Sequence, residues 1–239
     1  MLLKLRLSAI RTLIDLNEKF IFERRLKKFY QRKDIICSVI DVGANKGQTI
    51  DFFLKLNPKC NIYSFEPNPK LFSFLQSKYK KIPNVKIFNL GISNVTGEKL
   101  FYENLLDYTS SFEPLNPKSE YLAKKAKILG TNVDQIVVSE YKVETIRLSD
   151  FINNSQLSNI DVIKIDTEGH EYCCLQGLLN ESNLPEIKYI QIENHNDDMY
   201  IDGGDYKSIT TLLNANDFYE AECISHGFGN FNEIIFNKK

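Results

Sequence analysis

The stretch SVIDVGANKGQ, residues 38–48, joins an apolar run to a glycine-containing turn and decides the fold class. Its β-branched residues favour a buried strand, and Gly43 and Gly47 favour a tight turn before a helix over 49–56. Such a turn lets a ligand approach the backbone and presents free amide groups at the N-terminus of the helix. The sequence therefore predicts a ligand-binding strand–turn–helix unit at this position.

The spacing of the glycines narrows the class of ligand. Gly43 and Gly47 give G-x-x-x-G, which differs from the G-x-G-x-x-G of dinucleotide-binding folds, and the chain contains no G-K-[ST] phosphate loop. Asp41 precedes the first glycine, and an acid there suits a ligand with an ammonium group better than a pyrophosphate. Glu66 follows 23 residues after Gly43, at the end of the next expected strand. There it would accept both hydroxyls of a ribose, although a surface glutamate at a strand end is the simpler alternative.

Strand and helix patterns alternate along the rest of the chain. Strands are expected over 38–45, 61–68, 84–93, 161–169 and 188–195, helices over 49–56, 70–80, 170–180 and 206–216, and a hairpin at the C-terminus. Continuous apolar strands that alternate with helices are typical of a doubly wound, mostly parallel sheet covered on both faces. We therefore expect one α/β domain over 35–239.

Two segments depart from this alternation. Residues 1–34 have helical spacing of apolar residues and ten basic against four acidic residues, a local charge of +6. This basic helix could bind a membrane surface, pair two subunits in a homo-oligomer, or cover the domain, which is the usual use of an amphipathic stripe. Residues 94–150 form an insertion after the third strand, and a long insertion of this kind is often a lid or a substrate-recognition element.

Composition bounds the class of protein. The chain is 43% hydrophobic and 26% charged, with a formal net charge of −1, so no nucleic-acid partner is indicated. Its five cysteines form no C-x-x-C pair, which favours reduced thiols and a cytoplasmic location. No uninterrupted apolar run reaches the length of a signal peptide or membrane span, so no stable membrane insertion is expected.

Several motifs together resemble those of the FkbM family of methyltransferases. They are VIDVGANKGQ, SFEPNP, NLGIS, VETIRLSDFI, IDVIKIDTEGHEYCCLQGL and YIQIENH, which run from about residue 38 to 196. The resemblance implies a class I methyltransferase fold with a Rossmann-like seven-stranded sheet, S-adenosylmethionine as cofactor, and O-methylation of a sugar or natural product. A nucleotide-linked sugar is a plausible small-molecule acceptor on the same basis.

The resemblance also assigns roles to residues. Asp41, Gly43, Asn45 and Gly47 would hold the methionine moiety, Glu66 the ribose, and Gly91 and Ile92 would flank the adenine. The full set of expected cofactor-binding residues is Asp41, Gly43, Asn45, Gly47, Gln48, Glu66, Pro67, Asn68, Gly91 and Ile92.

A second polar cluster is expected at the carboxyl ends of two strands. Lys164 and Asp166 share a strand face by two-residue alternation, and so do Glu193 and His195 at the end of the next strand. Because ligands of open parallel sheets bind beyond these strand ends, the four residues are candidate catalytic residues. His195 or Asp166 could remove the proton of an acceptor hydroxyl. Alternatively, Asp166, Glu193 and His195 could bind Mg²⁺, Mn²⁺ or Fe²⁺ that acidifies this hydroxyl.

Other functions fit the pattern less well. A nicotinamide-dependent oxidoreductase on a similar fold would need the absent G-x-G-x-x-G. A non-catalytic cofactor-binding subunit would not need the polar cluster at 164–171 and 193–195. An RNA methyltransferase is disfavoured by the acidic main domain, whose charge outside residues 1–34 is −7.

Overall fold

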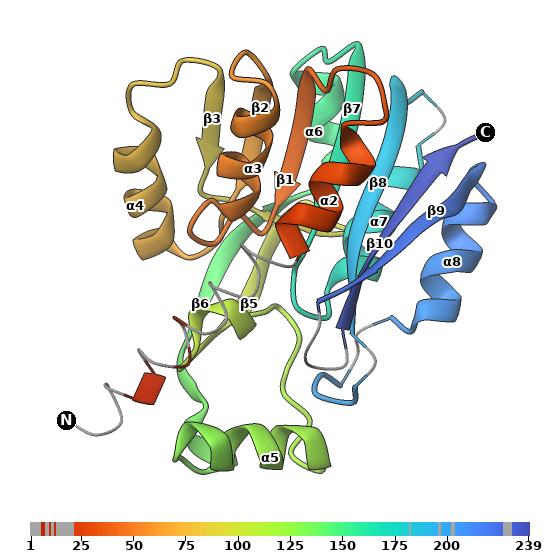
Figure 1. Ribbon diagram of the computed structural model, residues 1–239. Helices are drawn as coiled ribbons and strands as arrows, with labels where there is room; N and C mark the ends of the chain where they lie inside the picture. Colours follow the sequence, from red (N-terminus) through yellow and green to blue (C-terminus); the bar gives the residue numbers. More distant parts are fainter. Residues whose placement is uncertain are drawn as a thin grey trace.

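A computed structural model describes residues 6–7, 10, 12, 22–181, 183–195, 197–201, 204–226 and 231–239, and of His195 only the backbone. It has the expected α/β architecture, in which helices cover both faces of a central sheet (Figure 1).

The main sheet has seven strands in the order β3-β2-β1-β7-β8-β10-β9. Its first five strands pair in parallel, and β10 pairs antiparallel with both β8 and β9. The strands are β1 Ser38–Val42, β2 Asn61–Phe65, β3 Val85–Phe88, β7 Asn159–Ile165, β8 Glu186–His195, β9 Phe218–Ser225 and β10 Phe231–Lys238. The prediction of a doubly wound, mostly parallel sheet with a C-terminal hairpin is therefore confirmed.

Alternate residues of each strand face opposite helical layers. Val39 packs in the core beneath α2 (Glu23–Tyr30), α3 (Gln48–Leu56) and α4 (Pro69–Tyr79). Its neighbour Ile40 packs against α6 (Leu148–Asn154), α7 (Glu171–Leu179) and α8 (Tyr206–Asn214). Burial on both faces explains the nearly continuous apolar runs of the central strands.

The prediction of one continuous third strand over 84–93 is wrong. β3 ends at Phe88, and the Asn89 side chain donates to the carbonyl oxygens of Glu66 (2.8 Å) and Pro67 (3.0 Å), which turns the chain away from the sheet. The residues that follow, Gly91–Ile92 (β4), pair instead with β6. The apolar pattern runs through this turn, so the pattern alone could not reveal the break.

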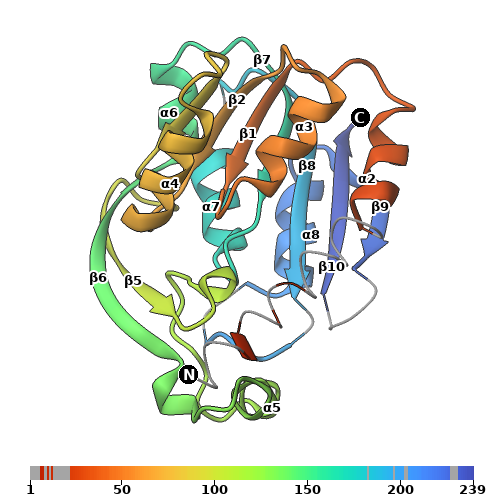
Figure 2. The ribbon, with the colours of Figure 1, turned by 60° about the vertical axis from the view of Figure 1, so that its left-hand side comes forward.

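The insertion folds as a second sheet with one helix. Its strands have the order β4-β6-β5, with β5 at Gly97–Asn104 and β6 at Val137–Ile146. Between them lie short 3₁₀ turns at Asp107–Thr109 (η2) and Val133–Gln135 (η3) and helix α5, Glu120–Leu129. Figures 1 and 2 place α5 beyond the edge of the main sheet at which the parallel strands end.

The described part of the N-terminal segment packs on the domain. Helix α2 buries Leu26, Phe29 and Tyr30 in the same core as α3, which favours the covering role among the three alternatives for this segment. Most of residues 1–21 lies outside the described residues, so pairing of subunits through this segment stays a prediction. Within the described part of the chain, no helix has the length and apolar character needed to cross a membrane.

Candidate functional site

One cavity of about 480 Å³ extends along the carboxyl ends of β1, β2, β7 and β8, and this volume is large enough for a small-molecule ligand. Its wall on the β1–β2 side includes residues expected to bind the cofactor: Gly43, Asn45, Gln48, Glu66, Pro67, Asn68, Gly91 and Ile92. Its wall on the β7–β8 side includes the expected catalytic residues Lys164, Asp166 and Glu193. The two predicted clusters therefore share one cavity.

The turn after β1 requires its glycines. Gly43 and Gly47 have φ angles of +88° and +84°, and Asn45 between them has +45°. A Cβ atom on Gly43 would lie 1.8 Å from the Asp166 carbonyl oxygen, so the two strand ends approach too closely for any side chain. The side-chain Oδ1 of Asn45 is buried without a hydrogen-bond partner among the described residues, which leaves an acceptor for a ligand.

Asp41 lies behind the cavity wall. Its side chain is 1% exposed, and its Oδ2 accepts a hydrogen bond from Ser64 Oγ at 3.0 Å. Burial raises the pKa of Asp41 to about 6, and the charge of Lys164 opposes this rise. The position of Asp41 suits support of the turn, and direct contact with a methionine moiety stays a prediction.

Glu66 presents a buried carboxylate to the cavity. It is 4% exposed, its Oε2 accepts from the backbone N–H of Asn45 at 2.7 Å, and its Oε1 accepts from the backbone N–H of Asn68 at 2.9 Å. Burial raises the pKa of Glu66 to about 8, although these two amides lower it. Each oxygen keeps a second lone pair, so the fixed carboxylate can still accept two hydroxyl groups.

Lys164 joins two carboxylates beneath the other wall. Its Nζ lies 3.0 Å from Asp166 Oδ2 and 2.7 Å from Glu233 Oε1, and the side chain of Lys164 is 5% exposed. Burial alone would lower the pKa of Lys164, but Asp166, Glu233 and Glu193 together raise it well above its usual value. Lys164 is therefore a fixed ammonium group that orients Asp166, and it is not a base.

Asp166 is the more exposed partner of this pair, with 34% of its side chain exposed against 5% for Lys164. Burial raises the pKa of its carboxyl group well above the usual value, the neighbouring Glu193 raises it further, and Lys164 lowers it. Carboxylate oxygens of Asp166, Glu168 and Glu193 lie within 4.8 Å of one another. This crowding of negative charge raises the affinity of the site for a proton or another cation.

Two residues of the site were missed by sequence reasoning, and both come from the β9–β10 hairpin. His226 lies with its Nε2 3.7 Å from Glu193 Oε1 and stacks on Phe22, with ring centres 4.2 Å apart. Glu233 of β10 is the register partner of Glu193. Glu233 is a lone acid within the apolar run NEIIF, and this feature of the sequence could have marked it as a candidate site residue. The side chain of His195 lies outside the described residues, so its proposed role as base stays a prediction.

The family of the chain follows from a comparison with known proteins. A sequence profile described as "Methyltransferase FkbM domain" matches residues 41–219, which is most of the chain. The chain belongs to the FkbM methyltransferase family.

Individual relatives are more distant. The 2-O-methyltransferase NoeI of Sinorhizobium fredii is 24% identical over 200 residues, which cover 80% of this chain and 75% of that protein. The hexuronic acid methyltransferase AglP of Haloferax volcanii is 27% identical over 174 residues, 72% of this chain and 59% of that protein. Among solved structures, the N-methyltransferase NodS of Bradyrhizobium japonicum is 10% identical with a TM-score of 0.49, covering 91% of this chain and 94% of that one.

As a member of the FkbM family, this chain is an S-adenosylmethionine-dependent methyltransferase with a class I fold. The alternative function as a nicotinamide-dependent oxidoreductase is therefore rejected. The residues of the β1–β2 wall fit S-adenosylmethionine. Glu66 can accept from a ribose, and the turn lines the cavity at Gly43 with backbone alone. When bound, S-adenosylmethionine supplies an electrophilic methyl group on a sulfonium.

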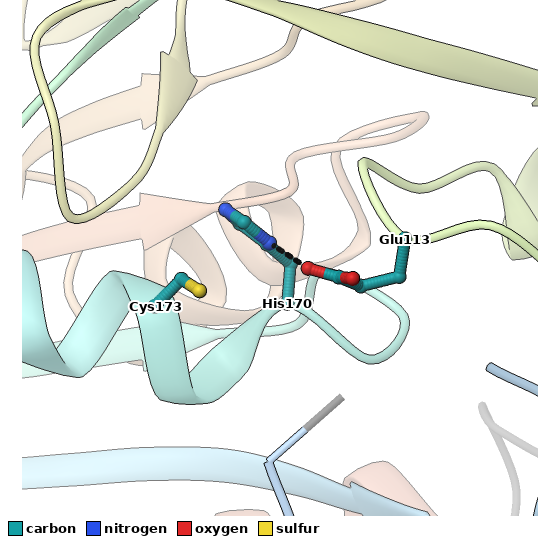
Figure 3. A group of neighbouring side chains, drawn as sticks. All are labelled: Glu113, His170 and Cys173. Atoms are coloured by element: carbon teal, nitrogen blue, oxygen red, sulfur yellow. Dashed lines mark hydrogen bonds and ion pairs between the residues drawn. The ribbon is translucent and has the colours of Figure 1, made fainter. Parts of the chain in front are cut away.

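A third polar cluster of this FkbM-family chain is structural. His170 is fully buried, with Nδ1 2.6 Å from Glu113 Oε1 and Nε2 2.9 Å from Ser93 Oγ. In the view of Figure 3 the Cys173 thiol lies on the opposite side of the His170 ring from Glu113. Because both ring nitrogens are already engaged, His170 ties the insertion to the start of α7.

The insertion forms a fixed wall of the cavity. Ser111 Oγ donates to the carbonyl of Thr167 at 3.2 Å, and the Tyr200 hydroxyl oxygen lies 3.0 Å from the carbonyl oxygen of Thr109. Residues 106–110 and Phe112 line the cavity. These contacts support a recognition element, as expected for 94–150; movement as a lid stays a prediction.

Proposed function

We propose that this methyltransferase transfers the methyl group to a hydroxyl of a sugar or nucleotide-linked sugar. The observation that carries the proposal is the oriented Lys164–Asp166 pair directly across the strand ends from the glycine turn at Gly43. A neutral hydroxyl needs a proton acceptor, whereas an amine acceptor in its free-base form does not need one to attack. The names of the relatives NoeI and AglP, a 2-O-methyltransferase and a hexuronic acid methyltransferase, agree with this class of acceptor.

In the proposed reaction Asp166 accepts the proton of the hydroxyl, and the hydroxyl oxygen would bond to the methyl carbon as the bond from that carbon to sulfur breaks and S-adenosylhomocysteine leaves. The Lys164 ammonium holds one carboxylate oxygen of Asp166, at 3.0 Å, so the other is free to face the acceptor. The raised pKa of Asp166 makes it a better base than an exposed aspartate. Alignment of oxygen, methyl carbon and sulfur by the two cavity walls supplies the remaining rate enhancement.

The alternative that a divalent ion at Asp166, Glu193 and His195 activates the hydroxyl is less favoured. The Lys164 ammonium already contacts Asp166 Oδ2, so a divalent ion would have to share this carboxylate with it. We propose direct proton transfer and treat dependence on added metal as the discriminating measurement.

Acceptor screening tests the proposal. Purified protein is incubated with S-adenosylmethionine and separate panels of methyl glycosides, nucleotide sugars and amino compounds, and S-adenosylhomocysteine is quantified. We expect turnover with a glycoside or nucleotide sugar, an O-methyl ether in the product by NMR, and loss of turnover in Asp166→Asn. A product methylated on nitrogen or carbon would contradict the proposal.

A further inference from the structure

Helix α5 turns one stripe of side chains toward the cavity. Tyr121, Lys125 and Ile128 follow at positions i, i+4 and i+7 of the helix, and all three line the cavity. The β7–β8 wall with Asp166 and Glu193 lines the same cavity. The insertion therefore contributes an aromatic ring, an ammonium group and an apolar side chain to the part of the site left for the acceptor.

The packing of α5 fixes this stripe in place. On its other side Leu122, Ala126 and Leu129 are buried, and the first two pack with Met199. Ahead of the helix, the backbone N–H of Asn116 donates to the carbonyl oxygen of Met199 at 2.8 Å. Ser119, which caps the helix, donates its hydroxyl to Asp198. A ligand would therefore meet a preformed surface.

The two lysines that line the cavity differ in their partners. Lys164 is held by two carboxylates, as described above. The Lys125 ammonium lies 3.5 Å from Met199 Sδ and 5.8 Å from the centre of the Tyr121 ring, and it has no ion pair among the described residues. A half-buried ammonium beside a thioether and a ring has lost part of its hydration without gaining a counter-charge.

Two acids of the cavity wall have partners near the strand ends. Asp166 contacts Lys164, and Glu168 Oε2 accepts from Tyr200 OH at 2.9 Å. Burial raises the pKa of Tyr121 to about 12, with Asp197, Glu168 and Glu193 adding to the rise, so its hydroxyl remains a hydrogen-bond donor. The α5 stripe thus offers a donor and a free positive charge, both of which suit an anion.

We propose that Lys125 and Tyr121 form a subsite for an anionic group of the acceptor, either a sugar carboxylate or a phosphate. The subsite rests on the proposed sugar acceptor and names its chemical class: a hexuronate or a nucleotide-linked sugar is preferred over a neutral hexose. The ammonium pairs with the anion, the Tyr121 hydroxyl donates to the same group or to the sugar, and Ile128 covers the ring.

Calorimetry on the full chain saturated with S-adenosylhomocysteine tests the subsite with three probes: methyl glucoside, methyl glucuronoside and UDP-glucose. We expect at least one anionic probe to bind about tenfold more tightly than methyl glucoside, as one charge-assisted contact provides. Lys125→Met should abolish this preference and Lys125→Arg should keep it. Lys124→Met, at the neighbouring exposed lysine of the same helix, is the matched control and should bind like the wild type.

The two anionic probes identify the source of the anion: preference for the glucuronoside indicates a sugar carboxylate, and preference for UDP-glucose indicates a phosphate. Equal binding of all three probes, or no detectable binding of either anion, overturns the subsite. The subsite is also overturned if Lys125→Met loses as much affinity for S-adenosylhomocysteine as for the anionic probe, because Lys125 would then serve the cofactor. A preference that depends on Lys125, without methyl transfer to any glycoside, retains the subsite and rejects the proposed sugar acceptor.

Discussion

Removal of the Glu66 carboxylate should weaken cofactor binding strongly. The side chain is 4% exposed and held by the amides of Asn45 and Asn68, so its oxygens cannot move away from a ligand. Two hydroxyl groups that donate to this carboxylate together contribute about 2–4 kcal/mol. Glu66→Ala should therefore lower the affinity for S-adenosylhomocysteine roughly 30- to 900-fold.

Isothermal calorimetry of wild type and variant measures this loss directly. Glu98→Ala is the matched control, because Glu98 pairs with Lys142 on the surface and its side chain is 59% exposed. The thermal midpoint of each protein without ligand shows whether the fold survives the loss of the two amide contacts. Affinity within threefold of the wild type, in a folded variant, would remove Glu66 from the cofactor site.

The pKa of Glu66 gives a second measurement on the same residue. Burial raises it to about 8 in the free protein, so Glu66 is mostly protonated at neutral pH. A ligand whose hydroxyls donate to the carboxylate stabilises the charged form and lowers this pKa. Binding should therefore release a proton near pH 7, affinity should rise between about pH 6 and 9, and both effects should disappear in Glu66→Ala. Binding that is independent of pH, without proton release, would refute the reasoning.

Three further predictions concern the turn and the charged pair. Gly43→Ala would place a methyl group 1.8 Å from the Asp166 carbonyl oxygen, so we expect a Tm lowered by several degrees and no further rise with S-adenosylhomocysteine; an unchanged ligand-induced shift would contradict this. Lys164→Met leaves Asp166 and Glu233 without their cation and should cost about 3–5 kcal/mol in urea unfolding; an unchanged midpoint would show that the pair is dispensable. Exhaustive chelation should leave turnover intact, whereas loss of turnover that added Mg²⁺ or Mn²⁺ restores would establish the metal alternative.

Local sequence features located the β1–β2 wall of the cavity. The turn at Gly43 and Gly47 was predictable because positive φ angles are strongly favoured by glycine, and the adjoining strand and helix follow from apolar patterns within a few residues. Glu66 was predictable from its distance along the chain, because a β–α–β unit has a nearly constant length. The boundaries were less accurate: the expected strand 61–68 ends at Phe65.

The residues that line the opposite side of the cavity could not all be derived in the same way. Sequence reasoning placed Lys164 and Asp166 together because they share one strand face, and the contact at 3.0 Å agrees. It could not supply Glu233, which enters through the antiparallel register of β10 with β8. Nor could it supply Lys125, which faces the cavity because α5 packs on the segment after β8.

The sequence by itself determined the alternation of strands and helices, the ligand-binding turn and the family of this protein. Only the tertiary structure decided which charges share the cavity, and that Lys125 has no ion pair among the described residues. The physical reason is the range of the interactions: backbone preferences and apolar periodicity act over a few residues, whereas the pairing of Tyr30 with Gln191, 161 residues apart, depends on how whole elements pack.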